Sequence, residues 1–121
     1  MLSLGVGGTI TVHFGERAIV DGPGVDFIVF ENAFWAGGDS QAPWKELGQV
    51  AVSDDGATWH DFACDTEGAG DATYPGCPGW SPTLDYEPFA EVPLAHESVG
   101  GDGFDLANIG VTQARFVRIT A

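Results

Sequence analysis

The sequence predicts an all-β protein built as an antiparallel β-sandwich with one long loop. Glycine and proline supply 18 and 7 of the 121 residues, more than a helical bundle tolerates, because both residues break helices. Apolar residues make up 44% of the chain, enough for one sandwich core. Strand-like segments are separated by turn sequences such as Asp21–Gly24. The length suits a single domain, residues 1–121.

The N-terminal part of the chain holds three expected strands and then a loop. Thr9–Phe14 alternates β-branched residues with others, which is typical of a strand with one buried face. Ala18–Val20 is expected to be a short strand. Val25–Phe30 is almost continuously apolar and predicts a central strand. Ala33–Leu47 is expected to be a loop rich in aromatic residues.

The C-terminal part contributes the remaining strands. Gly48–Ser53 and Thr58–Phe62 are expected to form a hairpin around Asp54–Gly56, where the glycine supplies a positive φ. Phe104–Ile109 predicts a short strand or a single helical turn. Ala114–Thr120 predicts the closing strand, because apolar and polar residues alternate along it.

The segment from Cys64 to about Gly101 is expected to be mostly irregular. A loop this long inside a compact domain is usually functional or held in place. Cys64 and Cys77 are separated by residues rich in Gly, Asp and Pro, and no CxxC pair favours a metal site. A disulfide between them would stabilise the fold by about 3 kcal/mol through loop-closure entropy. The alternative is a pair of unlinked buried thiols.

The charge balance excludes several partners. The net charge is −14, so the chain offers no basic surface to nucleic acid or to an anionic membrane. No stretch is long and apolar enough to enter a bilayer. A disulfide indicates an oxidising, extracellular location, although Met1–Leu4 lacks the features of a signal peptide. The carboxylates either serve solubility or bind a hard cation such as Ca²⁺.

One acidic constellation is expected to hold a structural Ca²⁺. It combines carboxylate and amide side chains at a strand end with carboxylates in a glycine-rich segment, and Ca²⁺ binds such oxygens together. The expected ligands are Glu31, Asn32, Asp102 and Asp105. The alternative is that Glu31 pairs with Arg115 or Arg118 while the aspartates cap turns. A second acidic group is expected to be solvated loop: Asp65, Glu67 and Asp71.

Aromatic residues in loops are the second candidate site. Aromatic rings outside strands stack on sugar rings or anchor protein partners. The expected ligand-binding residues are Trp35, Trp44, Trp80 and Tyr86. The alternative is that the loops fold back and bury these rings as a minor core. No nucleophile motif or zinc-protease motif is present, so an enzyme is not expected.

Several motifs resemble known proteins. Val50–Trp59 resembles the V-x-V-S-x-D-G-x-x-W hairpin of discoidin-like, galactose-binding-like jelly rolls, and Ala114–Ile119 resembles their A-R-Y-V-R-I strand. The whole pattern is similar to a family of bacterial cell-surface proteins with L-S-L-G-x-G-G-x-I, D-F-x-V-F-E-N, a cysteine pair and G-G-D-x-F-D-L-A. Those motifs stand at Leu2–Ile10, Asp26–Asn32, Cys64 with Cys77, and Gly100–Ala107.

The resemblance implies a jelly-roll sandwich located outside the cell or on a bacterial cell surface, without an established activity. Family members carry an earlier strand before L-S-L-G, so we expect this chain to be an excerpt of a longer precursor that lacks that strand. The chain also departs from the family at Cys77–Trp80, which places an extra tryptophan at the loop exit. A sandwich that lacks a strand exposes a sheet edge, which a neighbouring copy can fill.

The expected function is therefore a non-catalytic module for adhesion or assembly. Its expected partners are other copies of itself, surface proteins or glycans. One alternative is a structural subunit of an extracellular fibre or surface layer built by strand exchange. The other is a glycan-binding module that uses the loop aromatics.

Overall fold

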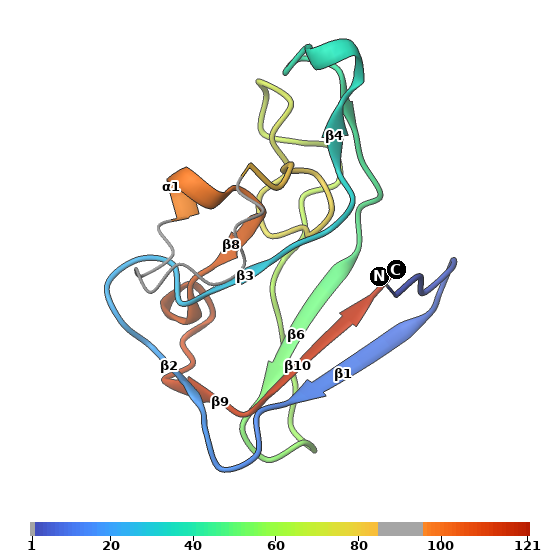
Figure 1. Cartoon of the computed structure of the whole chain (residues 1–121). Helices are drawn as coiled ribbons and strands as arrows, with labels where there is room; N and C mark the ends of the chain where they lie inside the picture. The colour runs from blue at the N-terminus through green and yellow to red at the C-terminus, as the bar shows by residue number, and fades with distance from the viewer. Residues whose placement is uncertain (1, 85–95) are drawn as a thin grey trace.

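The longest strands of the protein lie together in one antiparallel sheet (Figure 1). The computed structural model describes residues 2–84 and 96–121. Three strands of five residues, β1 (Thr9–His13), β10 (Phe116–Thr120) and β6 (Gln49–Ser53), pair in that order, and the two-residue β7 (His60–Asp61) follows β6. All three pairings are antiparallel. The predicted strands Thr9–Phe14 and Gly48–Ser53 are confirmed.

Shorter ladders surround this sheet. Each pairs two strands antiparallel: β2 (Ile19–Val20) with β9 (Gln113–Ala114), β3 (Phe27–Val29) with β8 (Asp102–Phe104), and β4 (Phe34–Trp35) with β5 (Pro43–Trp44). The helical elements in the described ranges are short: α1 (His96–Val99) and the 3₁₀ turns η1 (Ala36–Gly38) and η2 (Leu106–Ile109). The prediction of a β-rich, antiparallel protein is therefore confirmed, while the jelly-roll sandwich stays a prediction.

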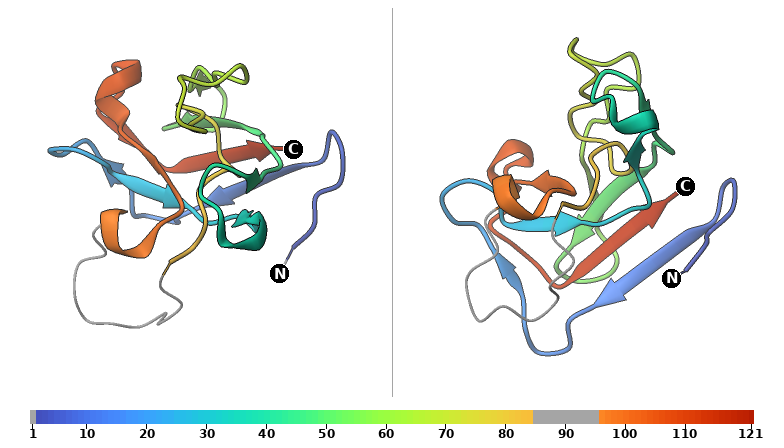
Figure 2. Two further views of the ribbon diagram at one scale, coloured as in Figure 1. Left: turned by 90° about the horizontal axis from the view of Figure 1, so that it is seen from above. Right: turned by 45° about the horizontal axis from the view of Figure 1, so that its top comes forward.

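The core is shared by residues of the four-stranded sheet and of the β3–β8 ladder, whose ribbons Figure 2 shows in two views. Val50, Val52 and Val117 share one face of the sheet, because residues two apart on a strand point the same way and paired residues share a face. Phe104 of β8 and Leu106 of η2 pack against them, and Leu106 is fully buried. Burying such a side chain contributes about 1.5–3 kcal/mol.

The opposite face of the sheet carries its own aromatic contacts. The rings of His13 and Phe116 stack with centroids 4.4 Å apart, and Trp59 meets Phe116 edge to face. The guanidinium of Arg118 lies 4.1 Å from the centroid of the Trp59 ring. Contacts between side chains therefore hold the rings on this face in place.

The irregular segment after β7 is fixed at two points. Cys64 and Cys77 form the predicted disulfide. Further along, the buried carboxylate of Asp102 accepts backbone hydrogen bonds from Gly79, Trp80 and Ser81. The contacts of Asp102 tie the segment to β8.

Two expectations about the fold are wrong. Val25–Phe30 is not a central strand, because β3 covers only Phe27–Val29 and pairs with β8 alone. Ala33–Leu47 is not a plain loop, because β4 and β5 pair within it and η1 joins them. Phe34 lies opposite Trp44 and Trp35 opposite Pro43. The resulting β4–β5 hairpin extends beyond the sheet at the top of Figure 1.

Candidate functional site

The free edge of β1 is the first candidate site. β1 lies at the end of the four-stranded sheet, and none of the described strands pairs with its outer side. At its two ends, Ala121 N–H donates to Gly8 and Phe14 N–H donates to Arg115. Hydrogen bonding alternates along an antiparallel strand, so Ile10 and Val12 bond to β10. Thr9, Thr11 and His13 direct their backbone N–H and C=O groups away from the sheet.

Side-chain burial falls toward this edge. Val52, Val117 and Val12 form one row across the inner face of the sheet. Their exposed fractions are 0%, 5% and 39%, in the order from β6 to β1. Phe14, which follows β1, is also exposed. The layer that covers β6 and β10 therefore does not cover β1.

Nothing in the sequence of β1 protects this edge. Natural sheet edges are usually blocked by charged residues, proline or a bulge. Thr9–His13 reads TITVH and contains no Lys, Asp, Glu or Pro, and it pairs with β10 in continuous register without a bulge. The other edge strand, β7, is two residues long and carries the exposed Asp61. The two edges thus differ in length and in charge.

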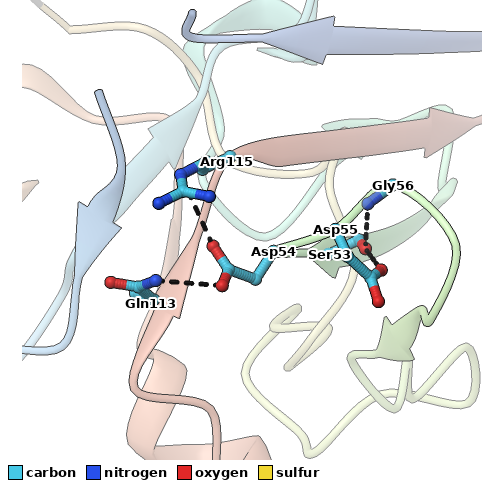
Figure 3. A network of polar contacts seen from close by, with 6 residues as sticks. All are labelled: Ser53, Asp54, Asp55, Gly56, Gln113 and Arg115. Atoms are coloured by element: carbon cyan, nitrogen blue, oxygen red, sulfur yellow. Dashed lines mark hydrogen bonds and ion pairs between the residues drawn. The ribbon is translucent and has the colours of Figure 1, made fainter. Parts of the chain in front are cut away.

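A shallow depression of about 430 Å³ lies at the end of β1, next to this edge. Its lining comes from three chain segments and includes His13, Glu16, Asp54, Asp55, Arg115 and Phe116. Arg115 Nε lies 3.7 Å from Asp54 Oδ1, and Gln113 donates to Asp54 Oδ2 at 2.9 Å (Figure 3). Asp54 thereby links the β6–β7 turn to β9 and to Arg115, the residue between β9 and β10.

Asp55, beside Asp54, organises the turn itself. Its carboxylate accepts hydrogen bonds from the backbone of Thr58 and Ala57 and from the Ser53 hydroxyl. The Ser53 oxygen in turn accepts a bond from Gly56 N–H (Figure 3). These donors, Thr58 first, lower the pKa of Asp55 to about 2. The carboxylates of Asp54 and Asp55 are therefore used within the fold.

The β4–β5 hairpin is the second candidate site. The rings of Phe34 and Trp44 are nearly parallel, with 13° between their planes and centroids 5.9 Å apart. Both are exposed, at 47% and 58%. Trp35 is 40% exposed and belongs to the other face of the hairpin, since it pairs with Pro43.

The other predicted aromatic residues lie elsewhere. Trp80 is half-buried and packs edge to face against Tyr74. This packing agrees with the alternative in which the loop folds back over its aromatic rings. Tyr86 lies outside the described residues. Phe34 was not among the expected site residues, because only its pairing with Trp44 distinguishes it from the other phenylalanines.

The four expected calcium ligands do not gather at one place. Asp102 and Asp105 are three residues apart on an extended chain, which puts their side chains on opposite sides. Asp102 points into the core and binds the segment 79–81. Asp105 caps η2 by accepting a hydrogen bond from Ala107 N–H. Asn32, which lies between β3 and the β4–β5 hairpin, is exposed.

Glu31 has another acidic group as its neighbour, not an arginine. Partial desolvation, and secondly the carboxylate of Glu46, raise the pKa of Glu31 above its ordinary value. The alternative pairing of Glu31 with an arginine is not seen: Arg115 pairs with Asp54, and Arg118 stacks on Trp59.

A different acidic cluster exists in the described part of the chain. Carboxylate oxygens of Asp21, Asp26 and Asp105 lie within 4.8 Å of one another. The β3–β8 register explains this, because Phe27 lies opposite Phe104 and places Asp26 beside Asp105. Asp26 already accepts hydrogen bonds from Gly22 and Leu106 N–H, both at 2.8 Å. A calcium ion remains a prediction from the sequence.

Comparisons with protein-family models, with curated proteins and with solved structures found no match. The resemblance to bacterial cell-surface jelly rolls therefore stays a prediction. No helix among the described residues has the length and apolar character needed to cross a bilayer.

Proposed function

We propose that this chain is a non-catalytic module of an extracellular or cell-surface protein, serving adhesion or assembly, and that it binds its partner by strand addition to β1. The observation that supports this most directly is the free edge of β1, with three outward N–H groups and three outward C=O groups at Thr9, Thr11 and His13. An added strand would satisfy these groups and cover the exposed Val12. The confirmed disulfide is in keeping with an oxidising location.

Amide hydrogen exchange along β1 tests this proposal. In the isolated chain, the amides of Ile10 and Val12 are expected to exchange slowly because they bond to β10, and those of Thr9, Thr11 and His13 are expected to exchange fast. When a partner strand binds, the three fast amides should become protected. Binding or assembly that leaves them unprotected would locate the interface elsewhere and contradict the proposal.

The exposed aromatic pair favours a second function, glycan binding at the β4–β5 hairpin. Parallel rings such as those of Phe34 and Trp44 offer flat apolar surfaces to the C–H faces of sugar rings. Carboxylates at Glu31 and Glu46, at the base of the hairpin, offer acceptors for hydroxyl groups. The net charge of −14 favours a neutral glycan over an acidic one.

Tryptophan fluorescence titrations with neutral oligosaccharides test the second function. Trp44→Ala is expected to abolish binding, because it removes half of the ring pair. Trp59→Ala, on the outer face of the sheet, is the matched control and should leave binding unchanged. If both variants bind like the unmodified chain, the hairpin is not the glycan site.

A further inference from the structure

The outward groups of β1 are arranged symmetrically around Thr11. Thr9 and His13 lie two residues to either side of it, and each of the three residues offers one N–H and one C=O to the same side. An antiparallel strand placed against this edge meets donors opposite acceptors at every second residue. A second copy of β1, turned by a two-fold rotation about Thr11, supplies the same groups at the same spacing.

This pairing has a defined register. Thr11 would face Thr11 of the second copy, and Thr9 would face its His13, so that each of the three residue pairs exchanges two backbone hydrogen bonds. The four-stranded sheet would then continue into that of the second copy. Such an interface uses the same patch on both copies, which is the commonest symmetry of protein dimers.

The side chains of β1 suit the same register. Ile10 would lie opposite Val12 of the second copy in the closely spaced, non-hydrogen-bonded pair. Val12, 39% exposed in the single chain, would thereby be covered by an apolar side chain. On the other face, His13 already stacks on Phe116, which holds its ring beside the position of Thr9 from the second copy. No acidic side chain lies on the paired strands.

The second edge of the sheet argues against an open chain of subunits. A head-to-tail sheet would need β1 to pair with β7 of the next copy. β7 offers two residues instead of five and carries the exposed Asp61, and charged residues are a common means of blocking a sheet edge. Pairing of β1 with β1 uses all five residues on both sides. The geometry of the edges therefore favours a closed pair over a fibre.

We propose that two copies of this chain pair through their β1 strands, antiparallel and with Thr11 on the two-fold axis. This inference rests on the proposed strand addition and specifies its partner and register. Because each copy carries a net charge of −14, added salt is expected to strengthen the pair by screening their repulsion. An interface limited to one strand and its neighbours is small, so the pair should form at high protein concentration.

Cysteine cross-linking of the full chain tests the register. In hydrogen-bonded pairs the Cα atoms are about 5.5 Å apart, within the range of roughly 4.4–6.8 Å that a disulfide spans. Thr11→Cys should therefore form a disulfide-linked dimer with itself under oxidation. Thr9→Cys alone should not, whereas a mixture of Thr9→Cys and His13→Cys should give a mixed dimer. Dimers from Thr9→Cys alone, with none from Thr11→Cys, would overturn the register.

Proline substitutions in β1 distinguish a loss of pairing between two copies from a loss of folding. The N–H of Thr11 points away from β10, so Thr11→Pro removes only a donor that the second copy would use. Light scattering should show the unmodified chain doubling in mass with concentration, while Thr11→Pro stays monomeric. Thr11→Lys is a second variant that blocks the edge by charge. Val12→Pro is the matched control: it breaks a bond to β10 and should lower the thermal midpoint much more than Thr11→Pro does.

A synthetic peptide with the sequence of residues 8–14 distinguishes failure of this inference from failure of strand addition. If the chain stays monomeric at all concentrations and salt levels but the peptide protects the amides of Thr9, Thr11 and His13, strand addition stands and the two-fold pair is wrong. If neither the peptide nor a second copy protects them, both the pair and the proposed strand addition fail. Protection with a doubled mass supports both.

Discussion

The four-stranded sheet and the segment 64–84 satisfy their backbone groups in different ways. In the sheet, β1, β10 and β6 pair residue by residue in unbroken register. In segment 64–84 no strand forms, and Thr83 makes an isolated bridge to Gly100. Its N–H groups instead bond to side-chain carboxylates and, for the most part, to carbonyls within the segment itself. The sheet distributes its stability over many similar contacts, whereas the segment depends on a few.

Gly79 illustrates how closely the segment is fitted. Its φ is +91°, and a Cβ atom added there would lie 2.1 Å from the carbonyl oxygen of Glu46. Only glycine allows both the backbone conformation and this close approach. The carbonyl of Gly79 accepts a hydrogen bond from Glu46 N–H, and its own N–H donates to Asp102. A single residue thus joins the segment to both the hairpin and β8.

Among the substitutions that test the difference between the sheet and segment 64–84, Asp102→Ala is expected to lower the free energy of unfolding most. Asp102 is 3% exposed, and its carboxylate accepts bonds from three consecutive N–H groups of the segment. Leaving buried donors without an acceptor should lower the free energy of unfolding by roughly 3–5 kcal/mol. Urea unfolding followed by tryptophan fluorescence measures the change.

Asp105→Ala is the matched control for Asp102. Asp105 is the neighbouring carboxylate on the other side of the strand and caps η2 with one local bond. Its loss should cost about 1 kcal/mol, as for other helix caps. If the two variants lose equal stability, the segment is not held by Asp102 and the comparison fails.

Removing the disulfide is expected to have the next largest effect. Cys64 and Cys77 are 13 residues apart, and opening a loop of this size should cost about 3 kcal/mol. The Cys64→Ser/Cys77→Ser double variant and the reduced chain should show the same lower urea midpoint. Amide exchange at Val50, Val52 and Val117 should keep its order of protection, because these residues belong to the sheet. An unchanged midpoint would show that other contacts alone fix the segment.

Asp26→Ala should have an intermediate effect. Asp26 accepts N–H bonds from Gly22 and Leu106 and so joins the turn before β3 to η2. Losing two bonds to a charged acceptor should cost about 2 kcal/mol. Asp21→Asn, which removes an exposed charge from the same cluster, should be neutral or slightly stabilising. Thermal midpoints with added Ca²⁺ test the predicted cation: a shift seen only in the unmodified chain would place it at this cluster.

The difference between the two regions also explains what could be predicted from the sequence. β1, β6 and the turn between β6 and β7 depend on alternation and on residues within a few positions, so their residues alone indicated them. The disulfide could be predicted because the two cysteines flank an irregular segment that is rich in Gly, Asp and Pro. The β4–β5 hairpin was missed because its paired strands are two residues long and one begins with Pro43, which weakens any strand pattern.

The candidate site was less predictable because it depends on strand order and register. The resemblance suggests an open edge, but only the order β1-β10-β6-β7 identifies β1 and β7 as the edge strands. The expected calcium ligands rest on their positions at a strand end and in a glycine-rich segment. The register of β3 with β8 then placed Val29, not Glu31, opposite Asp102. Asp102 accepts hydrogen bonds from residues 21 to 23 positions earlier in the chain. No local sequence pattern predicts contacts over such a separation.

The smallest expected change in stability concerns Asp55, in the β6–β7 turn of the four-stranded sheet. Backbone donors at Thr58 and Ala57, with the Ser53 hydroxyl, lower its pKa from 3.8 to about 2. A carboxyl whose pKa is lower in the folded state stabilises the fold above its ordinary pKa, and this contribution is lost as the pH falls through the folded value. Stability should therefore decline as the pH drops from about 4 to about 2, and Asp55→Asn should flatten that decline.

Urea midpoints measured over this pH range, with Asp61→Asn as a control that removes an exposed carboxylate from neighbouring β7, check the prediction. Equal slopes for Asp55→Asn and the unmodified chain would mean that the turn does not hold the carboxylate. Because its contacts span at most three residues, the change should stay within the β6–β7 hairpin and leave the protection of segment 64–84 unaltered. That outcome would separate a local contact, visible in the sequence, from the long-range contact at Asp102.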